Sequence, residues 1–254
     1  MSNQMIYQAQ FMKYLKFPAL SVILGANLAI TAIAPPVLAQ DTFISVKSTV
    51  TFTCNDTEAT IKGKNGPRVT VGTTNIYVGY QQVSSTNKNP RIIRFDNGVK
   101  KWCRTDYETT SDDSTGYGLL WNGSDVLYGV FSSTGSQTGD DFRRFTTGRW
   151  LSSYGTGGGA KVAIIARINP SNGDVNYATF LTAKKLSDGK TNSLVVTGLS
   201  WNGKSLTVEA DSWWSPRRAD KNSMICVGTS PFKYTGVFGG DLKQVSWAAA
   251  TGCY

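Results

Sequence analysis

The 254-residue sequence predicts an all-β fold built from repeated four-stranded sheets, on three observations. Apolar and polar residues alternate over many short runs, which is the period of a half-buried strand. Asn-Gly pairs stand between several of these runs, and this pair is a strong signal for a β-hairpin. Similar hairpins return after about 70–80 residues, and such a period indicates a repeated unit of sheet.

The first 39 residues are expected to be a signal peptide. Two lysines precede an apolar stretch from Phe17 to Ile33, and Val37-Leu38-Ala39 fits a cleavage site. A membrane anchor is the alternative, but the stretch is shorter than the ~20 residues of a spanning helix and ends in Pro35-Pro36. We expect a secreted or periplasmic protein with no transmembrane segment after processing, and one all-β domain over residues 40–254.

The processed chain carries 24 basic and 17 acidic residues, a net charge of +7, because two lysines leave with the signal peptide. A moderate positive charge favours an anionic glycan, the cell envelope or nucleic acid as a partner, although an excess of surface lysine is the simpler explanation. Export argues against nucleic acid. We therefore expect an anionic glycan or the cell envelope as partner, with no nucleic acid.

Four cysteines remain after processing: Cys54, Cys103, Cys226 and Cys253. An even number in an exported chain predicts two disulfides, and the sequence leaves all three pairings open. Zinc is the alternative, but the chain has no histidine and no Cys-x-x-Cys pair, so we expect no metal and no cofactor.

Strands are expected in order along the processed chain, divided by turn residues such as Asn, Asp and Gly. No helix is expected after the signal peptide; Ser246–Thr251, with its three alanines, is the weakest point of that prediction. The expected strands and hairpins are 44–54, 59–62, 68–71, 75–81, 91–103 around Asn97-Gly98, 116–131 around Asn122-Gly123, and four short runs within 160–215.

The repeat is clearest around two tryptophans. The segment from Leu119 to Tyr128 matches the segment from Leu199 to Val208, which places Trp121 and Trp201 at the same point. Other hairpins are followed by Trp102, Tyr177 and Trp247. Two hairpins per period give four strands per unit, with units at roughly 43–118, 119–192 and 193–254.

Residues 91–215 resemble the bacterial secreted β-propeller repeat. The likeness is carried by Arg167-Ile-Asn-Pro-Ser-Asn-Gly173 with Asn176-Tyr-Ala-Thr-Phe-Leu181, and by Ser193 to Gly203. The resemblance implies a β-propeller-like fold, with a β-sandwich as the alternative. A closed propeller has four to eight blades, so an extra N-terminal blade, a homo-oligomeric ring and a stacked sandwich all remain open.

Catalysis by a histidine base is excluded because histidine is absent. The remaining catalytic candidates are the paired carboxylates of two predicted loops, Asp112-Asp113 and Asp140-Asp141, which are the residues expected to act if the chain hydrolyses glycans. The same acids could bind calcium, although no EF-hand-like spacing is present. We expect no catalytic residue, so the hydrolase stays an alternative.

Aromatic and basic residues give the main candidates for ligand binding. Trp213-Trp214 lies in an unusual run, and in a straight strand one of the pair would be buried and the other exposed. The long loop 132–159 interleaves arginines with aromatics. Core packing is the simpler role for large aromatics. The candidate contact residues are Arg143, Arg144, Arg149, Trp150, Trp213, Trp214 and Arg217.

Together these observations predict a secreted, non-enzymatic protein that binds a ligand, with a glycan as the expected class, or associates with the cell envelope. Two alternatives remain from the sequence: an extracellular hydrolase acting on glycans, and a structural subunit of an extracellular assembly.

Overall fold

The computed structural model describes residues 42–134, 140–157 and 162–254. The signal peptide expected at residues 1–39 lies outside these ranges. Contacts within the chain define two units, residues 1–37 and 38–254, and every described residue belongs to the second unit. A search of the described residues finds no helix with the length and hydropathy needed to cross a membrane.

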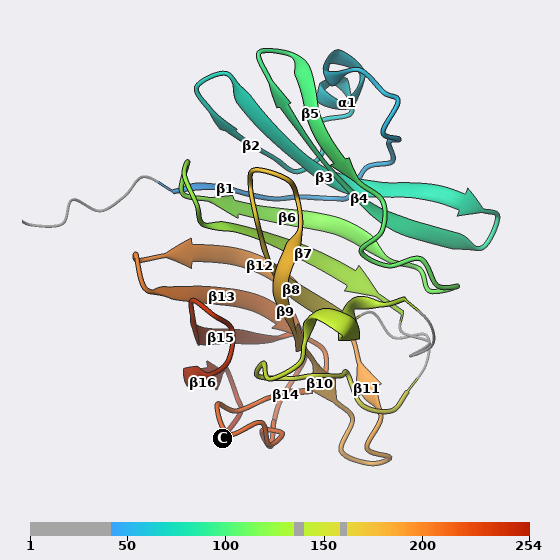
Figure 1. The fold of residues 1–254 in the computed structure, drawn as a ribbon. Coiled ribbons are helices and arrows are strands. Elements are labelled where there is room, and N and C mark those ends of the chain that lie inside the picture. Colours follow the sequence, from blue (N-terminus) through green and yellow to red (C-terminus); the bar gives the residue numbers. More distant parts are fainter. Residues whose placement is uncertain (1–41, 135–139, 158–161) are drawn as a thin grey trace, which may run out of the picture. The chain divides into compact units, whose positions relative to one another are not determined.

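Three antiparallel sheets make up most of the described chain (Figure 1), and each contains four strands joined in chain order. The middle sheet carries one additional strand, β1, on its edge beside β6. The expected all-β fold of repeated four-stranded sheets is therefore confirmed.

Each of the three large sheets is made of strands with the following bounds. The first sheet contains β2 (Arg68–Val71), β3 (Thr74–Ser84), β4 (Asn87–Asp96) and β5 (Val99–Arg104). The middle sheet contains β1 (Phe43–Val46), β6 (Thr115–Trp121), β7 (Leu127–Ser133), β8 (Val162–Ile168) and β9 (Val175–Leu181). The third sheet contains β12 (Leu194–Trp201), β13 (Ser205–Ser212), β15 (Phe232–Gly239) and β16 (Val245–Ala250).

A small sheet lies apart from these three and joins β11 (Thr191–Asn192), β10 (Ala183–Lys184) and β14 (Ser215–Pro216) in that order. Of the unit boundaries expected from the sequence, 118/119 falls within β6, whereas 192/193 falls between β11 and β12. The four-strand groups themselves run from 68 to 104, 115 to 181 and 194 to 250. Segment Ser246–Thr251, a doubtful strand from its alanines, lies mostly in β16.

The middle sheet is buried on both faces. Its neighbouring residues Leu119 and Leu120 point in opposite directions because side chains alternate along a strand. Leu119 joins a cluster with Ile76 and Ile92 of the first sheet, and Leu120 joins a cluster with Val208 of the third sheet. The core therefore consists of two apolar layers, one on each side of the middle sheet.

A short helix, α1 (Glu58–Gly63), covers the outer face of the first sheet, so the expected strand at 59–62 and the expectation of no helix after the signal peptide are both wrong. The Thr57 hydroxyl accepts a hydrogen bond from the Thr60 backbone N–H at 3.2 Å and caps the helix. Ile61 is buried in a cluster with Phe52, Tyr77 and Ile93. The cap and the burial of one isoleucine outweigh the weak β preference of this tetrapeptide.

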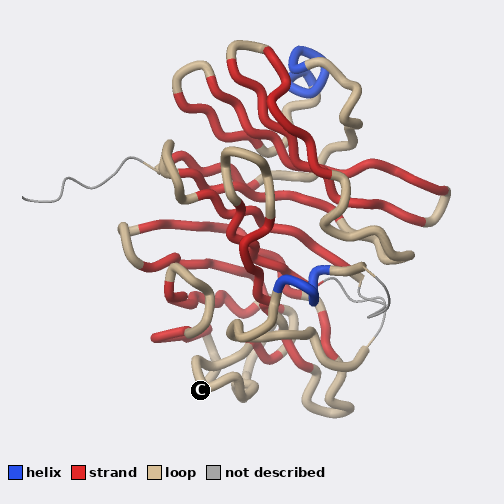
Figure 2. Tube along the Cα trace, viewed as in Figure 1, coloured by secondary structure: helices blue, strands red, loops and turns tan. Residues whose placement is uncertain are grey.

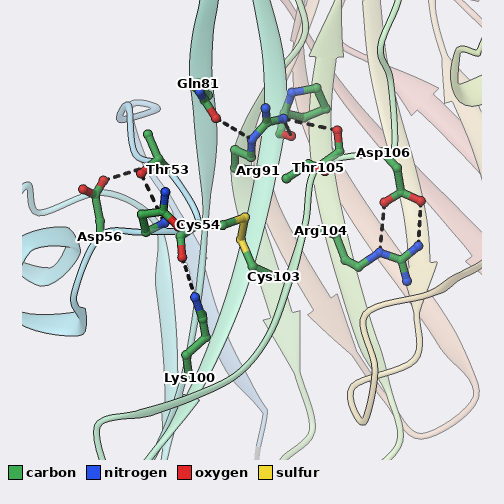
Figure 3. Close-up of a disulfide and its surroundings, with 12 residues drawn as sticks. Thr53, Cys54, Asp56, Gln81, Arg91, Lys100, Cys103, Arg104, Thr105 and Asp106 are labelled. Carbon is green, nitrogen blue, oxygen red and sulfur yellow. Dashed lines mark hydrogen bonds and ion pairs between the residues drawn. A yellow bond between two sulfur atoms is a disulfide. The ribbon is translucent and has the colours of Figure 1, made fainter.

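The expected strand 44–54 is also shorter than predicted, because only Phe43–Val46 pairs within a sheet. The following segment crosses the outer face of the first sheet, where the Phe52 backbone N–H donates to the Tyr80 carbonyl at 2.8 Å. The two disulfides expected from the sequence are present, as Cys54–Cys103 and Cys226–Cys253. Cys54–Cys103 ties this segment to β5 (Figure 3).

Further polar contacts hold the region around that disulfide (Figure 3). The Lys100 ammonium donates to the Cys54 carbonyl at 2.7 Å, and the Thr53 backbone N–H donates to Asp56 at 2.8 Å. Arg91 bridges strands by donating to Gln81 at 3.1 Å and to the Thr105 carbonyl at 3.3 Å. The Lys100 bond thus fixes the covering segment to β5, while the Arg91 bonds join neighbouring strands of the sheet.

The two tryptophan hairpins occupy equivalent places. Trp121 ends β6 and pairs with Leu127, while Trp201 ends β12 and pairs with Leu206. In each turn the asparagine after the tryptophan accepts two backbone hydrogen bonds, Asn122 from Ser124 and Val126, and Asn202 from Lys204 and Ser205. Each hairpin is the first of its sheet in chain order (Figure 1). Figure 2 shows the strands in red in the same view.

The last hairpins are equivalent as well, and they join neighbouring sheets. Trp102, Tyr177 and Trp247 each lie on the last strand of a sheet. The Trp102 indole donates to the Pro170 carbonyl at 3.0 Å, and the Tyr177 hydroxyl donates to the Gly240 carbonyl at 3.3 Å. Each acceptor lies in the last turn of the next sheet, so one type of aromatic contact is used twice.

The middle and third sheets are also joined through Tyr117 of β6. Its hydroxyl accepts a hydrogen bond from the backbone N–H of Val196 at 3.0 Å. Val196 is buried on β12, which is the edge strand of the third sheet. The tyrosine thus satisfies a donor that a further strand would otherwise bind.

We expect Tyr117→Phe to lower the free energy of unfolding by roughly 1–3 kcal/mol, because the Val196 N–H would be buried without an acceptor. Urea denaturation followed by tryptophan fluorescence measures this. Tyr254→Phe is the control, since Tyr254 is 73% exposed. An equal response of the two variants would contradict the role given to the Tyr117 hydroxyl.

Candidate ligand-binding surface

Trp213 and Trp214 lie where the chain bends between β13 and β14. In a straight strand one ring would be buried, but here the rings are 41% and 39% exposed. The Trp213 backbone N–H donates to the Ser193 carbonyl at 3.3 Å, and the Ser212 hydroxyl donates to the Trp214 carbonyl at 2.6 Å. The backbone contacts hold the bend, so two large rings face solvent together.

Two clefts, each of about 370 Å³, share this tryptophan pair. One lies toward the connection between β14 and β15, and the other lies toward the start of β12. The first is lined by Leu186, Ser187, Trp213, Trp214, Ser215, Cys226, Gly228, Ser230 and Phe232. The second is lined by Asn192, Ser193, Val195, Trp213 and Trp214. Apolar rings and small polar groups therefore both line this surface.

A groove of about 420 Å³ continues this surface along the edge strand β12. Val195 lines both the groove and the second cleft. The opposite side of the groove comes from residues 46–49 and from β6, with the hydroxyls of Ser48, Thr49 and Thr115 among its lining groups. The groove and the second cleft thus share the wall residue Val195, and the two clefts and the groove are together called the trough.

Positive charge gathers at one end of the trough. Residues 184–190 contain three lysines and one aspartate, a net charge of +2. The Lys185 ammonium lies 5.6 Å from the centre of the Trp214 ring and 3.4 Å from Asp188. A ligand that stacks on Trp214 would therefore meet a cation beside the ring.

The Cys226–Cys253 disulfide holds the rim of the first cleft. The Ile225 and Val227 backbone N–H groups donate to the carbonyls of Tyr254 and Gly252 at 2.9 and 2.8 Å. The disulfide joins the same two segments, so the C-terminus is tied to the connection that carries Cys226 and Gly228. This connection has no long strand of its own, and the crosslink supplies the order that it needs.

Trp150, a predicted contact residue, belongs to the core, and the prediction of a surface role for it is wrong. It is 2% exposed, its ring lies edge-on to Phe238 at 5.3 Å, and its indole N–H donates to the Ala219 carbonyl at 3.1 Å. The basic and aromatic interleaving of its loop indicated a surface, but the large apolar ring is more stable in the layer between sheets.

The other predicted arginines bind groups of their own chain. Arg143 pairs with Asp141 at 2.7 Å, Arg144 lies 4.7 Å from the Phe145 ring, and Arg149 lies 4.3 Å from the Tyr177 ring. Arg217 is half-buried and donates to the Lys221 carbonyl at 3.0 Å. None of the four lines either cleft beside the tryptophan pair.

The paired carboxylates have local partners too. Asp140 lies 3.4 Å from Arg144, Asp141 accepts from the Arg143 backbone N–H at 2.8 Å, and Asp113 lies 3.9 Å from Lys88. Asp112 is 4% exposed. Of these acids, none lines the two clefts or the groove.

No protein-family model, curated protein or solved structure matches the chain. The resemblance of residues 91–215 to the secreted β-propeller repeat therefore stays a prediction. The candidate surface rests on its own geometry.

Sequence reasoning named Trp213 and Trp214 but missed the residues that complete their surface. Leu186 and Val195 are exposed by 53% and 36%, and Lys185 lies beside Trp214. These residues come from segment 182–195, which lies close to the tryptophan pair because β10 pairs with β14, β12 pairs with β13, and the Ser193 carbonyl accepts from the Trp213 N–H. A cluster of lysines between two predicted strands was the one available signal.

We expect the double variant Cys226→Ser, Cys253→Ser to increase amide hydrogen exchange across residues 217–231 by at least about tenfold, since a crosslink of this kind contributes ~2–4 kcal/mol. Hydrogen exchange with mass spectrometry gives the rates by segment. The matched control is Cys54→Ser, Cys103→Ser, which should raise exchange near residues 52–57 and 100–104 instead. Unchanged protection of 217–231 in the first variant would show that the crosslink does not hold the cleft rim.

Proposed function

We propose that this chain is a secreted, non-enzymatic binding protein, and that the trough centred on Trp213 and Trp214 binds an anionic polysaccharide. The observation that carries the proposal is the exposure of two adjacent tryptophan rings, 41% and 39%, on the wall shared by two clefts. Large aromatic rings are normally buried, so two that are held together in solvent call for an external partner.

Carbohydrate fits the chemistry of the trough. The apolar face of a sugar ring stacks on an indole, while its hydroxyl groups need donors and acceptors at the side. The lining supplies these from Ser187, Asn192, Ser193 and Ser230. The continuation past Val195 into the groove along β12 favours several sugar units in a row over a single unit.

The lysines favour an acidic sugar. The segment 184–190 has a net charge of +2, and Lys185 lies beside the Trp214 ring. A carboxylate or sulfate on the sugar next to the stacked one would gain a charge-assisted hydrogen bond there. The surplus of basic residues over the whole processed chain acts in the same direction, by attracting polyanions.

An extracellular address supports a glycan partner. Two disulfides, Cys54–Cys103 and Cys226–Cys253, are typical of chains that fold outside the reducing cytosol. The sequence before residue 40 is the expected export signal. The hydrolase alternative is not carried forward, because the acids Asp112, Asp113, Asp140 and Asp141 line neither the clefts nor the groove.

We expect Trp213→Ala and Trp214→Ala each to weaken binding of an acidic oligosaccharide by roughly tenfold or more, the loss of a central aromatic contact. Titration calorimetry with a uronic-acid oligomer and a neutral oligomer of equal length measures this. Trp247→Ala is the matched control, because Trp247 is 51% exposed but lies away from the trough on β16. If the control loses as much affinity as the two variants, the site is not at Trp213–Trp214.

We further expect Lys185→Gln to weaken binding of the acidic oligomer by roughly two- to fivefold and to leave the neutral oligomer unchanged, as for a charge at the rim of a site. The loss should disappear at high salt, where the ion pair is screened. Calorimetry at two salt concentrations gives both results. Lys243→Gln, at an exposed lysine paired with Asp241, is the control. Equal effects on both oligomers would remove the preference for acidic sugars.

A further inference from the structure

The connection between β5 and β6 gathers buried oxygen atoms that lack donors. Nine buried side-chain polar atoms of the described chain have no hydrogen-bond partner, and six of them are oxygens from residues 87–89 and 108–114. Buried polar groups are nearly always satisfied, so an excess of unpaired oxygens in these two neighbouring segments indicates a group that the protein atoms do not supply. The six atoms are Asn87 Oδ1, Asn89 Oδ1, Glu108 Oε2, Asp112 Oδ2, Asp113 Oδ1 and Ser114 Oγ.

Hydrogen bonds join the two segments that carry these oxygens. The Asn87 side-chain amide donates to the Thr110 carbonyl at 2.9 Å, and the Ser114 backbone N–H donates to the Lys88 carbonyl at 2.8 Å. Within the connection, the Thr110 backbone N–H donates to Glu108 Oε1 at 2.5 Å, and the Asp112 backbone N–H donates to the Thr110 hydroxyl at 3.2 Å. The loop is therefore folded onto the start of β4.

Two of the side chains are carboxyl groups removed from solvent. Glu108 is 0% exposed and Asp112 is 4% exposed. Neither forms an ion pair with a lysine or arginine of the described residues, whereas Asp113 next to them pairs with Lys88. Burying a carboxylate without a counter-charge costs several kcal/mol.

The Glu108 carboxyl has a neutral hydroxyl group beside it rather than a cation. Ser114, fully buried, lies near the same carboxyl and supplies a hydroxyl. Asn89, at 8% exposed, adds a neutral amide oxygen without a donor. Two carboxyl groups together with unpaired amide oxygens are the ligands that a hard cation prefers, and a proton shared by the carboxyl groups would leave the amide oxygens unpaired.

We propose that Glu108 and Asp112, with the amide oxygens of Asn87 and Asn89, bind a calcium ion beneath this loop. The two carboxylates balance the charge of a divalent ion, and calcium accepts amide and main-chain oxygens as further ligands. Within the described residues no three His, Cys, Asp or Glu side chains converge, so the site depends on neutral oxygens for the rest of its coordination. The absence of sulfur and imidazole from the cluster argues against zinc.

The ion would stabilise the connection between the first and middle sheets. The loop adjoins Tyr107, which is buried between the first and middle sheets and donates to the Gly173 carbonyl. A filled site would hold the connection between these two sheets and remove the repulsion between two buried acids. This role is separate from sugar binding at Trp213–Trp214, so each proposal stands or fails without the other.

Calorimetric titration of the chelator-treated protein with calcium chloride tests the proposal, using magnesium chloride and potassium chloride as comparisons. We expect saturable binding of calcium, with magnesium much weaker. We expect the melting temperature to rise by roughly 5–10 °C at a calcium concentration about 100 times Kd. No saturable binding and no calcium-dependent melting shift would overturn the proposal; this is also the result expected if the two carboxyl groups share a proton.

Isosteric variants locate the ion. Asp112→Asn and Glu108→Gln should each weaken calcium binding by roughly tenfold or more, because each removes a charged ligand. In chelator the same variants should melt at or above the temperature of the unsubstituted protein, since each removes a buried charge. A purely structural acid would show a lower melting temperature in both conditions. Glu209→Gln, an exposed acid on β13, is the control. Calcium binding that survives in both isosteric variants would place the ion elsewhere.

Discussion

Burial of the middle sheet on both faces is the constraint on which the remaining structure depends. A strand that is covered on both sides needs apolar residues at nearly every position, and β8 reads Val-Ala-Ile-Ile-Ala-Arg-Ile, with Arg167 near its end as the one exception. Ile164 and Ile165, next to each other and both 0% exposed, serve opposite layers. The first and third sheets each need only one apolar face. Removing either would leave an apolar face of the middle sheet in water, so the three sheets depend on one another.

The outer faces of the first and third sheets are covered differently. Helix α1 and the segment held by Cys54–Cys103 cover the first sheet with Ile61 and Phe52. The third sheet instead presents charged groups, such as the Lys233–Asp211 pair at 2.7 Å. Trp102 and Tyr177, on the last strands of the first two sheets, pair across the strands with Arg94 and Arg167. At the equivalent position of the third sheet, Trp247 pairs with Val237. The pattern of contacts between sheets thus ends at a polar face with one exposed tryptophan.

The elements that sequence predicted well are those fixed by local chemistry. Alternation and Asn-Gly turns located the hairpins at Asn97-Gly98 and Asn122-Gly123, where Asn97 and Gly98 both have positive φ angles of 51° and 74°. Helix α1 was missed because six residues carry too little periodicity to separate helix from strand. Trp150 was misplaced because a basic neighbourhood in sequence does not reveal which layer a ring enters. Trp213 and Trp214 were named from the sequence, but the bend that exposes both is held by hydrogen bonds, including one from Trp213 to Ser193, that leave no local signal in the sequence.

The candidate surface lies where the chain departs from the four-strand pattern. Two of the connections that exceed what a sheet of consecutive strands requires are 182–193, between β9 and β12, and 213–231, between β13 and β15. Their short strands β10, β11 and β14 form the small sheet, and their residues Leu186, Asn192, Trp213 and Trp214 line the clefts. A repeated sheet supplies rigidity, and insertions into it are free to vary without exposing the core.

The connection from 105 to 114, which holds the unpaired oxygens, is a third such departure, between the first and middle sheets. The proposed binding residues therefore lie mainly in segments that the repeat does not need, which explains why the pattern that predicted the scaffold was silent about most of the candidate site.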